Sequence, residues 1–252
     1  MKQAIPLAAL LVLLAGCSAP HVGARAGVGF TELDGDVGIQ SGDVASTNST
    51  EDLGLDDDEP FPFAGADFRW GSPHLTVGYG RAGFSGTGTA SAEISQGGTT
   101  IPVGALVDSE LDVGVGSALV TFDLVPTEAF EAGIGLGLAS LDLDGEVREI
   151  ATGESVAGSQ VFVMPVLAAR AGARFGPFQV EALASGTRLD FEGDTLDYYD
   201  LDLNARYDLF RGAWLGAGWR EVGADVEFDD DGADVEVDLR LRGPYLALTL
   251  AF

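Results

Sequence analysis

The sequence predicts an all-β fold: a single antiparallel transmembrane β-barrel of about ten strands, with eight strands as the alternative. Three observations support this prediction. Segments with apolar residues at every second position alternate with connectors rich in Gly and Asp. The connectors alternate between short and long, and the chain ends in a strand-like segment with a terminal Phe. No stretch beyond the first 16 residues is apolar enough to cross a membrane as a helix.

The clearest strand is expected at residues 199–209. Its odd positions are Tyr, Leu, Leu, Ala, Tyr and Leu, and its even positions are Asp, Asp, Asn, Arg and Asp. A Tyr at each end of the apolar face is typical of an aromatic girdle at each membrane interface. The length of this segment also suits a tilted strand that crosses the hydrocarbon. A soluble sandwich would show the same alternation, so the strand alone does not decide between the two folds.

Three further segments show the same two-faced pattern. Residues 22–30, 130–138 and 161–175 each place mainly apolar side chains on one face and mainly Gly or charged side chains on the other. Pro165 interrupts the last segment, and a Pro has no backbone N–H to give to a central strand. It indicates either an irregularity or a strand that continues above the membrane.

The lengths of the connectors favour a membrane barrel over a sandwich. The short connectors are 71–73, 125–127, 176–177 and 210–212, and the long ones are 34–60, 91–109, 144–158, 190–197 and 228–233. Short periplasmic turns and longer extracellular loops are typical of outer-membrane barrels. Five long loops and four short turns imply ten strands, with both chain ends on the periplasmic side. An even number of strands also closes the barrel without a free edge in the lipid.

The N-terminal region contains an export signal and the single cysteine. Lys2 is followed by an apolar run at 5–14 and by small residues before Cys17, a pattern typical of a secretory signal peptide. Residues 14–17 resemble a bacterial lipobox, which implies cleavage before Cys17 and lipid modification of that residue. The alternative is an ordinary signal cleaved near Ala19, which leaves no lipid. The predicted organisation is a signal peptide (1–16), a short N-terminal segment (17–21) and the barrel (22–252).

The C-terminal segment resembles the signal by which the barrel-assembly machinery recognises outer-membrane barrel proteins. Phe252 ends the chain, and Leu246, Leu248 and Leu250 occupy alternate positions before it. Together with the export signal, this segment makes the chain similar to small bacterial outer-membrane β-barrel proteins. The resemblance implies the cell outer membrane of a Gram-negative-type bacterium. Its partners would then be outer-membrane lipid and lipopolysaccharide, and the assembly machinery during biogenesis.

The faces opposite the apolar ones are expected to line the barrel interior, where we predict a network of paired charges. Its members are Arg25, Arg69, Arg170, Arg174, Arg206, Arg220, Asp67, Asp123, Glu131, Glu181, Asp202 and Asp208. Equal numbers of cations and acids suit a water-poor interior, because an unpaired buried charge costs several kcal/mol. Ten strands filled in this way favour an occluded lumen, and the alternative is a narrow cation-favouring pore for small solutes. The alternation changes phase at Leu141, at 115–118 and at 242–246, which indicates bulges or strand extensions beyond the membrane.

Charge and histidine content limit the classes of function. A balance of 13 Lys+Arg against 40 Asp+Glu gives −27, which argues against a nucleic-acid partner because phosphate contacts need clustered cations. Both histidines, His21 and His74, are predicted on the periplasmic rim, so a Ser–His–carboxylate site at the outer surface lacks its His. We therefore expect a non-enzymatic barrel with a structural or surface-interaction role. After the pore, the second alternative to this role is an outer-membrane enzyme acting on lipid or peptide, and the oligomeric state is left open.

Acidic residues are concentrated in the long connectors. Between Asp34 and Pro60 there are nine acids and no base. In the last connector Glu227, Asp229 and Asp231 loosely imitate the spacing of an EF-hand calcium loop, but no helices flank them. The Asp-Gly pair there is more simply a tight hairpin turn. We expect no cofactor, and only a loose attraction of divalent cations to a solvated acidic surface.

Overall fold

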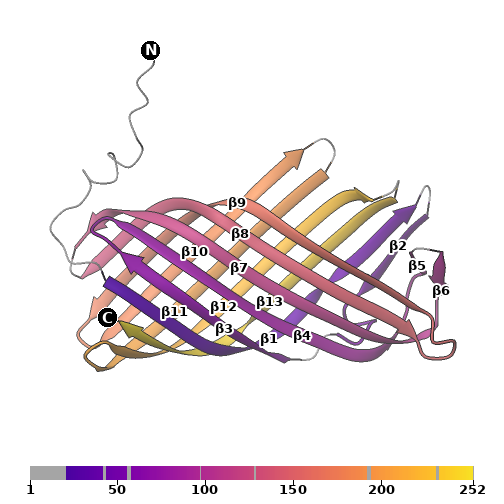
Figure 1. Cartoon of the computed structure of the whole chain (residues 1–252), viewed down its shortest axis with the longest axis horizontal. Helices are drawn as coiled ribbons and strands as arrows, with labels where there is room; N and C mark the ends of the chain where they lie inside the picture. Colours follow the sequence, from indigo (N-terminus) through magenta and orange to yellow (C-terminus); the bar gives the residue numbers. More distant parts are fainter. Residues whose placement is uncertain are drawn as a thin grey trace, which may run out of the picture.

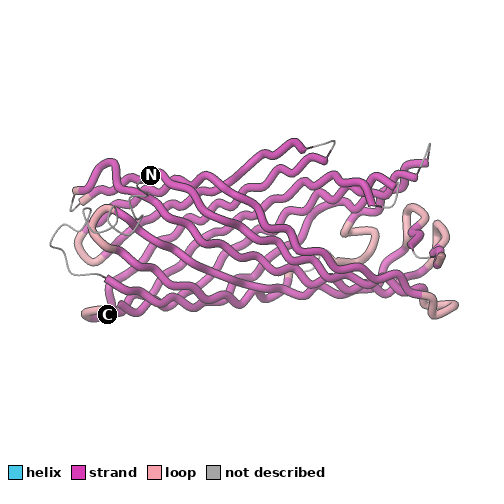
Figure 2. Tube along the Cα trace, turned by 45° about the horizontal axis from the view of Figure 1, so that its top comes forward, coloured by secondary structure: helices cyan, strands magenta, loops and turns pink. Residues whose placement is uncertain are grey.

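The structure is an elongated β-barrel (Figure 1 and Figure 2). This computed structural model describes residues 21–41, 44–55, 58–96, 98–127, 129–191, 194–230 and 233–251, and every regular element in them is a β-strand. In this part of the chain, no helix has the length and apolar character needed to cross a membrane. The segment predicted to be a signal peptide, Cys17 and Phe252 lie outside the described residues.

Ten strands form the barrel wall, each antiparallel to its neighbours, and the last pairs with the first to close the ring. They are β1 (His21–Ser41), β3 (Glu59–Arg69), β4 (Pro73–Thr89), β7 (Leu106–Pro126), β8 (Phe130–Glu149), β9 (Ser155–Phe175), β10 (Phe178–Phe191), β11 (Asp194–Phe210), β12 (Ala213–Asp230) and β13 (Ala233–Ala251). A short strand, β2 (Val44–Ser49), extends the sheet beside β1, and β5 (Ile94–Gln96) pairs with β6 (Thr99–Ile101) in a separate hairpin. The closed ten-stranded antiparallel barrel predicted from the sequence is confirmed.

The two ends of the barrel differ in their connections. At one end, which we call the short-turn end, tight turns join β3 to β4, β9 to β10 and β11 to β12, and the described chain also begins and ends there (Figure 1). Gly176 and Gly212 have φ values of 60° and 86°, a left-handed conformation that Gly adopts without a steric penalty. At the opposite long-loop end, the strands continue into all five connectors predicted to be long. β8 reaches Glu149 and β9 starts at Ser155, because the strand alternation persists through the Gly- and Asp-rich sequence.

An apolar band surrounds the half of the barrel next to the short-turn end. Its side chains point outward and are exposed, and aromatic residues stand at both of its borders. Phe30, Tyr79 and Trp219 lie at the border toward the long loops, and Phe68, Phe122, Phe130, Phe175, Phe178 and Tyr207 lie at the border near the short turns. Leu246, Leu248 and Leu250 also face outward in this band. Two aromatic girdles around an apolar belt are typical of a barrel that spans an outer membrane.

Beyond this band the two faces of the barrel wall exchange their character: the outward face becomes charged and the inward face becomes apolar. Along β1, Phe30 points outward within the band, whereas farther along Glu32 points outward and Leu33 is buried inside with 1% exposure. Along β13 the same change occurs between Leu246, which points outward, and Leu241, which is buried inside. The pairing of β1 with β13 keeps one register throughout, so no bulge causes the change. The phase changes seen in the sequence are therefore strand extensions into water, where apolar side chains turn inward.

The extended half of the wall separates into two sheets. Pairing between β9 and β10 stops at Leu167 and Gly186, and pairing between β3 and β4 stops at Phe63 and Gly80. One sheet then consists of β4, β7, β8 and β9, and the other of β10, β11, β12, β13, β1 and β2. Their inner faces enclose one apolar core that includes Phe84, Val113, Val115, Leu141, Met164, Leu33, Val222, Leu239 and Leu241. The molecule is thus a closed barrel in its apolar band and a packed sandwich beyond it.

A short segment, residues 50–55, covers this core at the long-loop end, and we call it the capping segment. Leu53 and Leu55 are buried in the core with 5% and 4% exposure. The backbone N–H of Thr89 donates a hydrogen bond of 2.7 Å to the carbonyl of Asp52, which holds the segment against β4. The alternating Leu-Gly-Leu sequence in this acidic connector is therefore a structural cap. The sequence offered no explanation for it.

Close backbone contact between the capping segment and β4 requires Gly86. We expect Gly86→Ala to lower the free energy of unfolding by about 1–3 kcal/mol, because the added methyl group would lie 1.8 Å from the Gly54 carbonyl oxygen. Gly78→Ala is the matched control, since its methyl group would meet only the Ala64 carbonyl oxygen at 3.8 Å. Urea midpoints followed by Trp fluorescence in detergent micelles compare the two variants. Equal midpoints would contradict this packing.

Candidate functional site

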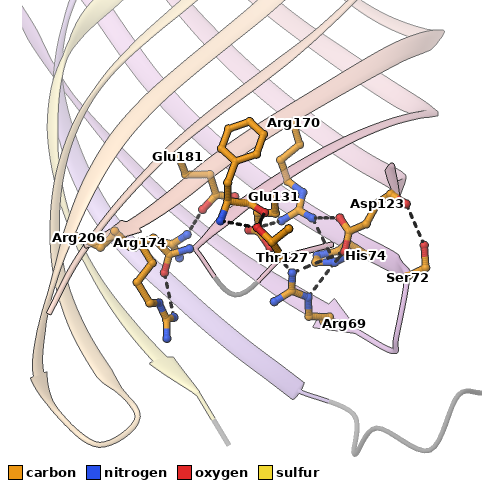
Figure 3. A network of polar contacts seen from close by, with 12 residues as sticks. Arg69, Ser72, His74, Asp123, Thr127, Glu131, Arg170, Arg174, Glu181 and Arg206 are labelled. Carbon is orange, nitrogen blue, oxygen red and sulfur yellow. Dashed lines mark hydrogen bonds and ion pairs between the residues drawn. The ribbon is translucent and has the colours of Figure 1, made fainter. Parts of the chain in front are cut away.

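A network of charged side chains fills the lumen near the short-turn end (Figure 3). Its centre consists of Arg69 from β3, His74 from β4, Asp123 from β7, Glu131 from β8 and Arg170 from β9. Strand alternation turns each of these side chains inward, and the short turns bring the ends of β3 and β4, and of β7 and β8, to the same level. Residues far apart in the sequence therefore meet in one layer across the barrel.

Arg170 is the most buried cation of this layer. Its Nη1 donates to Glu131 Oε1 at 2.9 Å and its Nη2 donates to Asp123 Oδ1 at 2.6 Å. The side chains of Arg170 and Asp123 are only 6% and 4% exposed. A guanidinium that bridges two carboxylates makes charge-assisted hydrogen bonds, which are the strong ones, although the Nε of Arg170 is buried and has no hydrogen-bond partner among the described residues. Arg69 completes the layer with an ion pair to Glu131 and a contact of 3.7 Å to Asp123 Oδ2.

His74 lies inside this layer, and its prediction as a residue of the periplasmic rim was wrong. Its ring is buried, and its Nε2 accepts a hydrogen bond of 2.8 Å from Arg69 Nε. The same nitrogen is 2.9 Å from Asp123 Oδ2 and 3.1 Å from Arg170 Nη2. The reason is geometric: β4 begins at Pro73, so His74 is its first residue on the inward face. His21, by contrast, is exposed at the start of β1.

A second group of ion pairs lies deeper in the lumen. Arg25 Nη1 is 3.2 Å from Asp202 Oδ2, and Tyr245 donates its hydroxyl to the other oxygen of Asp202. Arg220 donates to both oxygens of Asp200 at 3.0 and 2.8 Å. These guanidiniums also stand over aromatic rings, Arg25 over Phe63 at 5.5 Å and Arg220 over Phe61 at 5.8 Å. Arg206 forms an ion pair with Glu181 nearer the mouth, and Thr76 donates a hydrogen bond to Asp67.

The structure brings together most of the residues proposed for the network, but two lie apart. Arg174 is exposed at the mouth and donates to the Gln179 side chain at 3.3 Å, and Asp208 is exposed. Three members were missed: His74, Asp200 and Tyr245. Asp200 shares the inward parity of Asp202 in the clearest strand, so the alternation alone could have identified it. The side chains of Glu227 and Asp229, and all of Asp231, lie outside the described residues.

The lumen narrows in steps from the short-turn end. A cavity of about 390 Å³ lies at the mouth and reaches His74, Arg170 and Glu181. Above it a pocket of about 30 Å³, with room for one or two water molecules, is lined by Arg25, Asp202 and Arg220 on one side. Its other walls are Val115, Val222 and Leu241, which belong to the apolar core. The polar cavities of the lumen therefore end where the apolar core of the two packed sheets begins.

The central layer also contains a donor set that could in principle hold a metal ion. One ligand atom each from His74, Asp123 and Glu131 lies within 4.8 Å of the others. The guanidiniums of Arg69 and Arg170 occupy the same carboxylate oxygens, however, and a divalent cation beside two fixed cations is electrostatically unfavourable. The arrangement suits a closed ion-pair layer better than a metal centre.

Known proteins resemble this chain in fold rather than in sequence. No family model matches it, and neither does any curated protein sequence. Among solved structures, the outer membrane protease OmpT from Escherichia coli has a TM-score of 0.60 and 12% identity, covering 92% of this chain and 97% of that one. Ail, the attachment invasion locus protein of Yersinia pestis, has a TM-score of 0.36 and 7% identity, over 93% of this chain and all 100% of that one. The Pseudomonas putida toluene transporter TodX has a TM-score of 0.31 and 10% identity, over 93% and 90%. At these identities only the fold is shared, and it is that of outer-membrane β-barrel proteins.

Proposed function

From this fold, we propose that the chain is a non-enzymatic barrel of a Gram-negative-type outer membrane with a structural or surface-interaction role. The observation that carries the proposal is the double closure of its interior. The Arg–carboxylate layers lie across the lumen within the apolar band, beside the cavity at its mouth, and the apolar core of the two packed sheets closes the half beyond it. A protein whose interior is sealed twice is suited to present a surface, not to pass a solute.

The apolar core argues against the narrow-pore alternative. Val113, Val115 and Leu119 of β7 are at most 1% exposed, and Leu239 and Leu241 of the facing sheet are at most 5% exposed. A hydrated ion on this path would lose its water without gaining a polar partner, which costs far more than thermal energy. The charged layers below the core are themselves paired, so they offer no row of free carboxylates for a cation to follow.

The described histidines argue against the enzyme alternative. His74 is the buried one, and its Nε2 is already in contact with Arg69, Asp123 and Arg170. A general base needs a ring nitrogen free to take a proton from a substrate, and Nε2 of His74 is not free. His21 is exposed, but it lies at the short-turn end, away from the proposed outer surface. The similarity to a protease extends to the fold alone and brings no catalytic residue with it.

The proposed orientation places the short-turn end in the periplasm. The half beyond the apolar band carries outward charges such as Glu32, Asp34, Arg240 and Arg242, which require water. Short turns in the periplasm and long extensions at the cell surface are typical of this class. The acidic extensions would attract divalent cations only loosely, and neighbouring lipid and lipopolysaccharide would surround the band.

Conductance in planar bilayers tests the double closure. We expect the purified protein to give no reproducible current steps, because neither the ion layers nor the apolar core leaves a water-filled path. A porin reconstituted in parallel checks that insertion and recording work. Reproducible cation-selective steps from the barrel would overturn the proposal in favour of the pore.

We further propose that Cys17 carries a lipid. The first strand begins at His21, four residues later, so a lipid at the proposed periplasmic end could enter the inner leaflet beside the barrel wall. Intact-mass spectrometry of protein purified from membranes should show a mature chain that starts at Cys17 with an acyl-glyceryl adduct. A mass that fits cleavage near Ala19 would remove the lipid from this account.

A further inference from the structure

One strand of the extended half has a free edge. Residues Ser155–Val161 of β9 pair with β8, from the Ser155–Arg148 pair to the Val161–Asp142 pair. On the other side, β10 pairs with β9 only from Phe178 to Gly186, and its remaining residues pair with β11 alone. In Figure 1 the tip of the β10–β11 hairpin points away from the start of β9. Among the described residues, no strand is therefore paired with the second edge of 155–161.

The composition of this edge is unusual for a free strand. Proteins commonly protect such edges with charged side chains, which discourage another chain from pairing there. The edge reads Ser-Val-Ala-Gly-Ser-Gln-Val and has no charge, in a protein in which 21% of residues are charged. All of its residues are exposed except the half-buried Val156. Its backbone is extended, and among the described residues no strand pairs with it on this side, although the β5–β6 hairpin lies close to β9.

Acidic side chains lie beside the edge. On β8, Asp142, Asp144 and Glu146 point outward next to it, and Asp197 lies on the diverging hairpin. Arg148 neutralises Glu146 at 2.8 Å and Arg188 is 3.9 Å from Asp197, whereas no ion pair of Asp142 or Asp144 occurs within the described ranges. A strand added to β9 would lie two strand spacings, about 10 Å, from β8. That distance is close to the screening length in physiological salt, so the charges would act on the added strand.

We infer that this β9 edge binds an extended, basic segment of a partner polypeptide by strand addition. Main-chain hydrogen bonds would supply affinity, and alternate basic side chains would face the acidic residues of β8. A second copy of this chain fits less well, because it would bring another acidic surface with a net charge of −27 against the first. The inference names a class of partner for the proposed surface role. It rests on that role only for where the basic segment comes from, not for the strand addition itself.

Binding of a designed peptide to the full barrel in detergent micelles tests the inference. The probe is a fluorescent nonapeptide of alternating Arg and Val, and its control is the same peptide with alternate backbone amides N-methylated. Both have the same charge and side chains, but the control cannot complete the main-chain ladder. We expect the control to bind about tenfold more weakly or worse, because several hydrogen bonds are lost. Equal binding of the two peptides would overturn the inference.

Hydrogen exchange and one pair of variants locate the binding. The alternate amides of 155–161 that point away from β8 should exchange fast in the free protein and become protected when the probe binds, whereas those that point toward β8 should be protected in both states. Ser159→Lys should weaken probe binding several-fold, whereas Thr87→Lys adds the same charge to the exposed face of β4 and should leave it unchanged. Protection confined to other residues, equal effects of the two variants, or an edge already protected without peptide would each contradict the inference. None of these outcomes bears on conductance, so the proposed closed barrel is judged separately.

Discussion

Replacing Arg170 by alanine should lower the free energy of unfolding by about 3–5 kcal/mol, the cost of breaking a buried ion pair by removing one partner. Asp123 would keep only His74 and a contact of 3.7 Å from Arg69, although its side chain is 4% exposed. Glu131 would keep Arg69 alone. The loss arises less from the hydrogen bonds themselves than from the carboxylate left buried without its cation. Urea unfolding in micelles, with band shifts on unboiled gels as a second readout, measures it.

Two further variants separate this cause from a general packing defect. Arg170→Leu with Asp123→Leu removes a cation and an anion together, so the layer stays balanced through Arg69 and Glu131. We expect this double variant to recover at least half of the lost stability. Arg188→Ala removes an exposed cation 3.9 Å from Asp197 and should change stability by less than about 1 kcal/mol. A double variant as unstable as Arg170→Ala would show that volume, not charge, sets the cost.

Leu141→Asp should be the most damaging substitution in the extended half. Leu141 is 1% exposed within the core between the two sheets, so a carboxylate there would be buried without a partner. We expect a loss of several kcal/mol, or failure to reach the compact form on unboiled gels. Ser140→Asp, one residue earlier on β8, places the same group on the outward face at the border of the apolar band, between Leu138 and Asp142. The free energy of unfolding of the Ser140→Asp variant should remain within about 0.5 kcal/mol of that of the unsubstituted protein.

This pair of neighbouring substitutions also tests the exchange of faces. A barrel surrounded by lipid along its whole length would tolerate a charge at the inward Leu141 and reject one at the outward Ser140. The structure requires the opposite result at this level of β8. Unfolding midpoints in the reverse order would therefore contradict the division of the wall into a membrane band and an extended sandwich.

Much of this fold could be predicted from the alternation of apolar and polar residues. This alternation does not show how far along the barrel axis a residue lies. A two-residue period assigns each side chain to a face, which was enough to place Arg25, Arg170 and Arg220 inside, and the alternating lengths of the connectors were enough to count ten strands. It does not show which residues share a layer, because the register around the closed ring determines that. Arg25 meets Asp202 across a separation of 177 residues, a pairing that no local pattern contains. The network could therefore be predicted in composition but not in its contacts.

A local sequence pattern also does not reveal whether a strand segment is surrounded by lipid or by water. The phase change at Leu141 was interpreted as either a bulge or an extension, because both shift the apolar residues to the other face. The structure resolves it through an unbroken register between β7 and β8 at that level. The position of His74 was missed for a similar reason. It follows the turn by one strand residue, and that single residue decides whether the side chain lies at the rim or is buried in the lumen. The free edge of β9 was also beyond prediction, because it depends on where a neighbouring strand turns away.

Closure of the ring has a consequence for how the protein is made. The seam between β1 and β13 joins Gly23 to Ala251, the two extremes of the described chain. Contacts between such distant residues form slowly, because a very long loop must be ordered before they contribute. No ring can exist until β13 is in place, so the edge of β1 that faces β13 must stay unpaired until then, although the other edge of β1 can pair with β3 earlier. The extended sandwich also contains β1 and β13 on one side, and its apolar core must wait for the same final event. Assembly is therefore timed by the C-terminus.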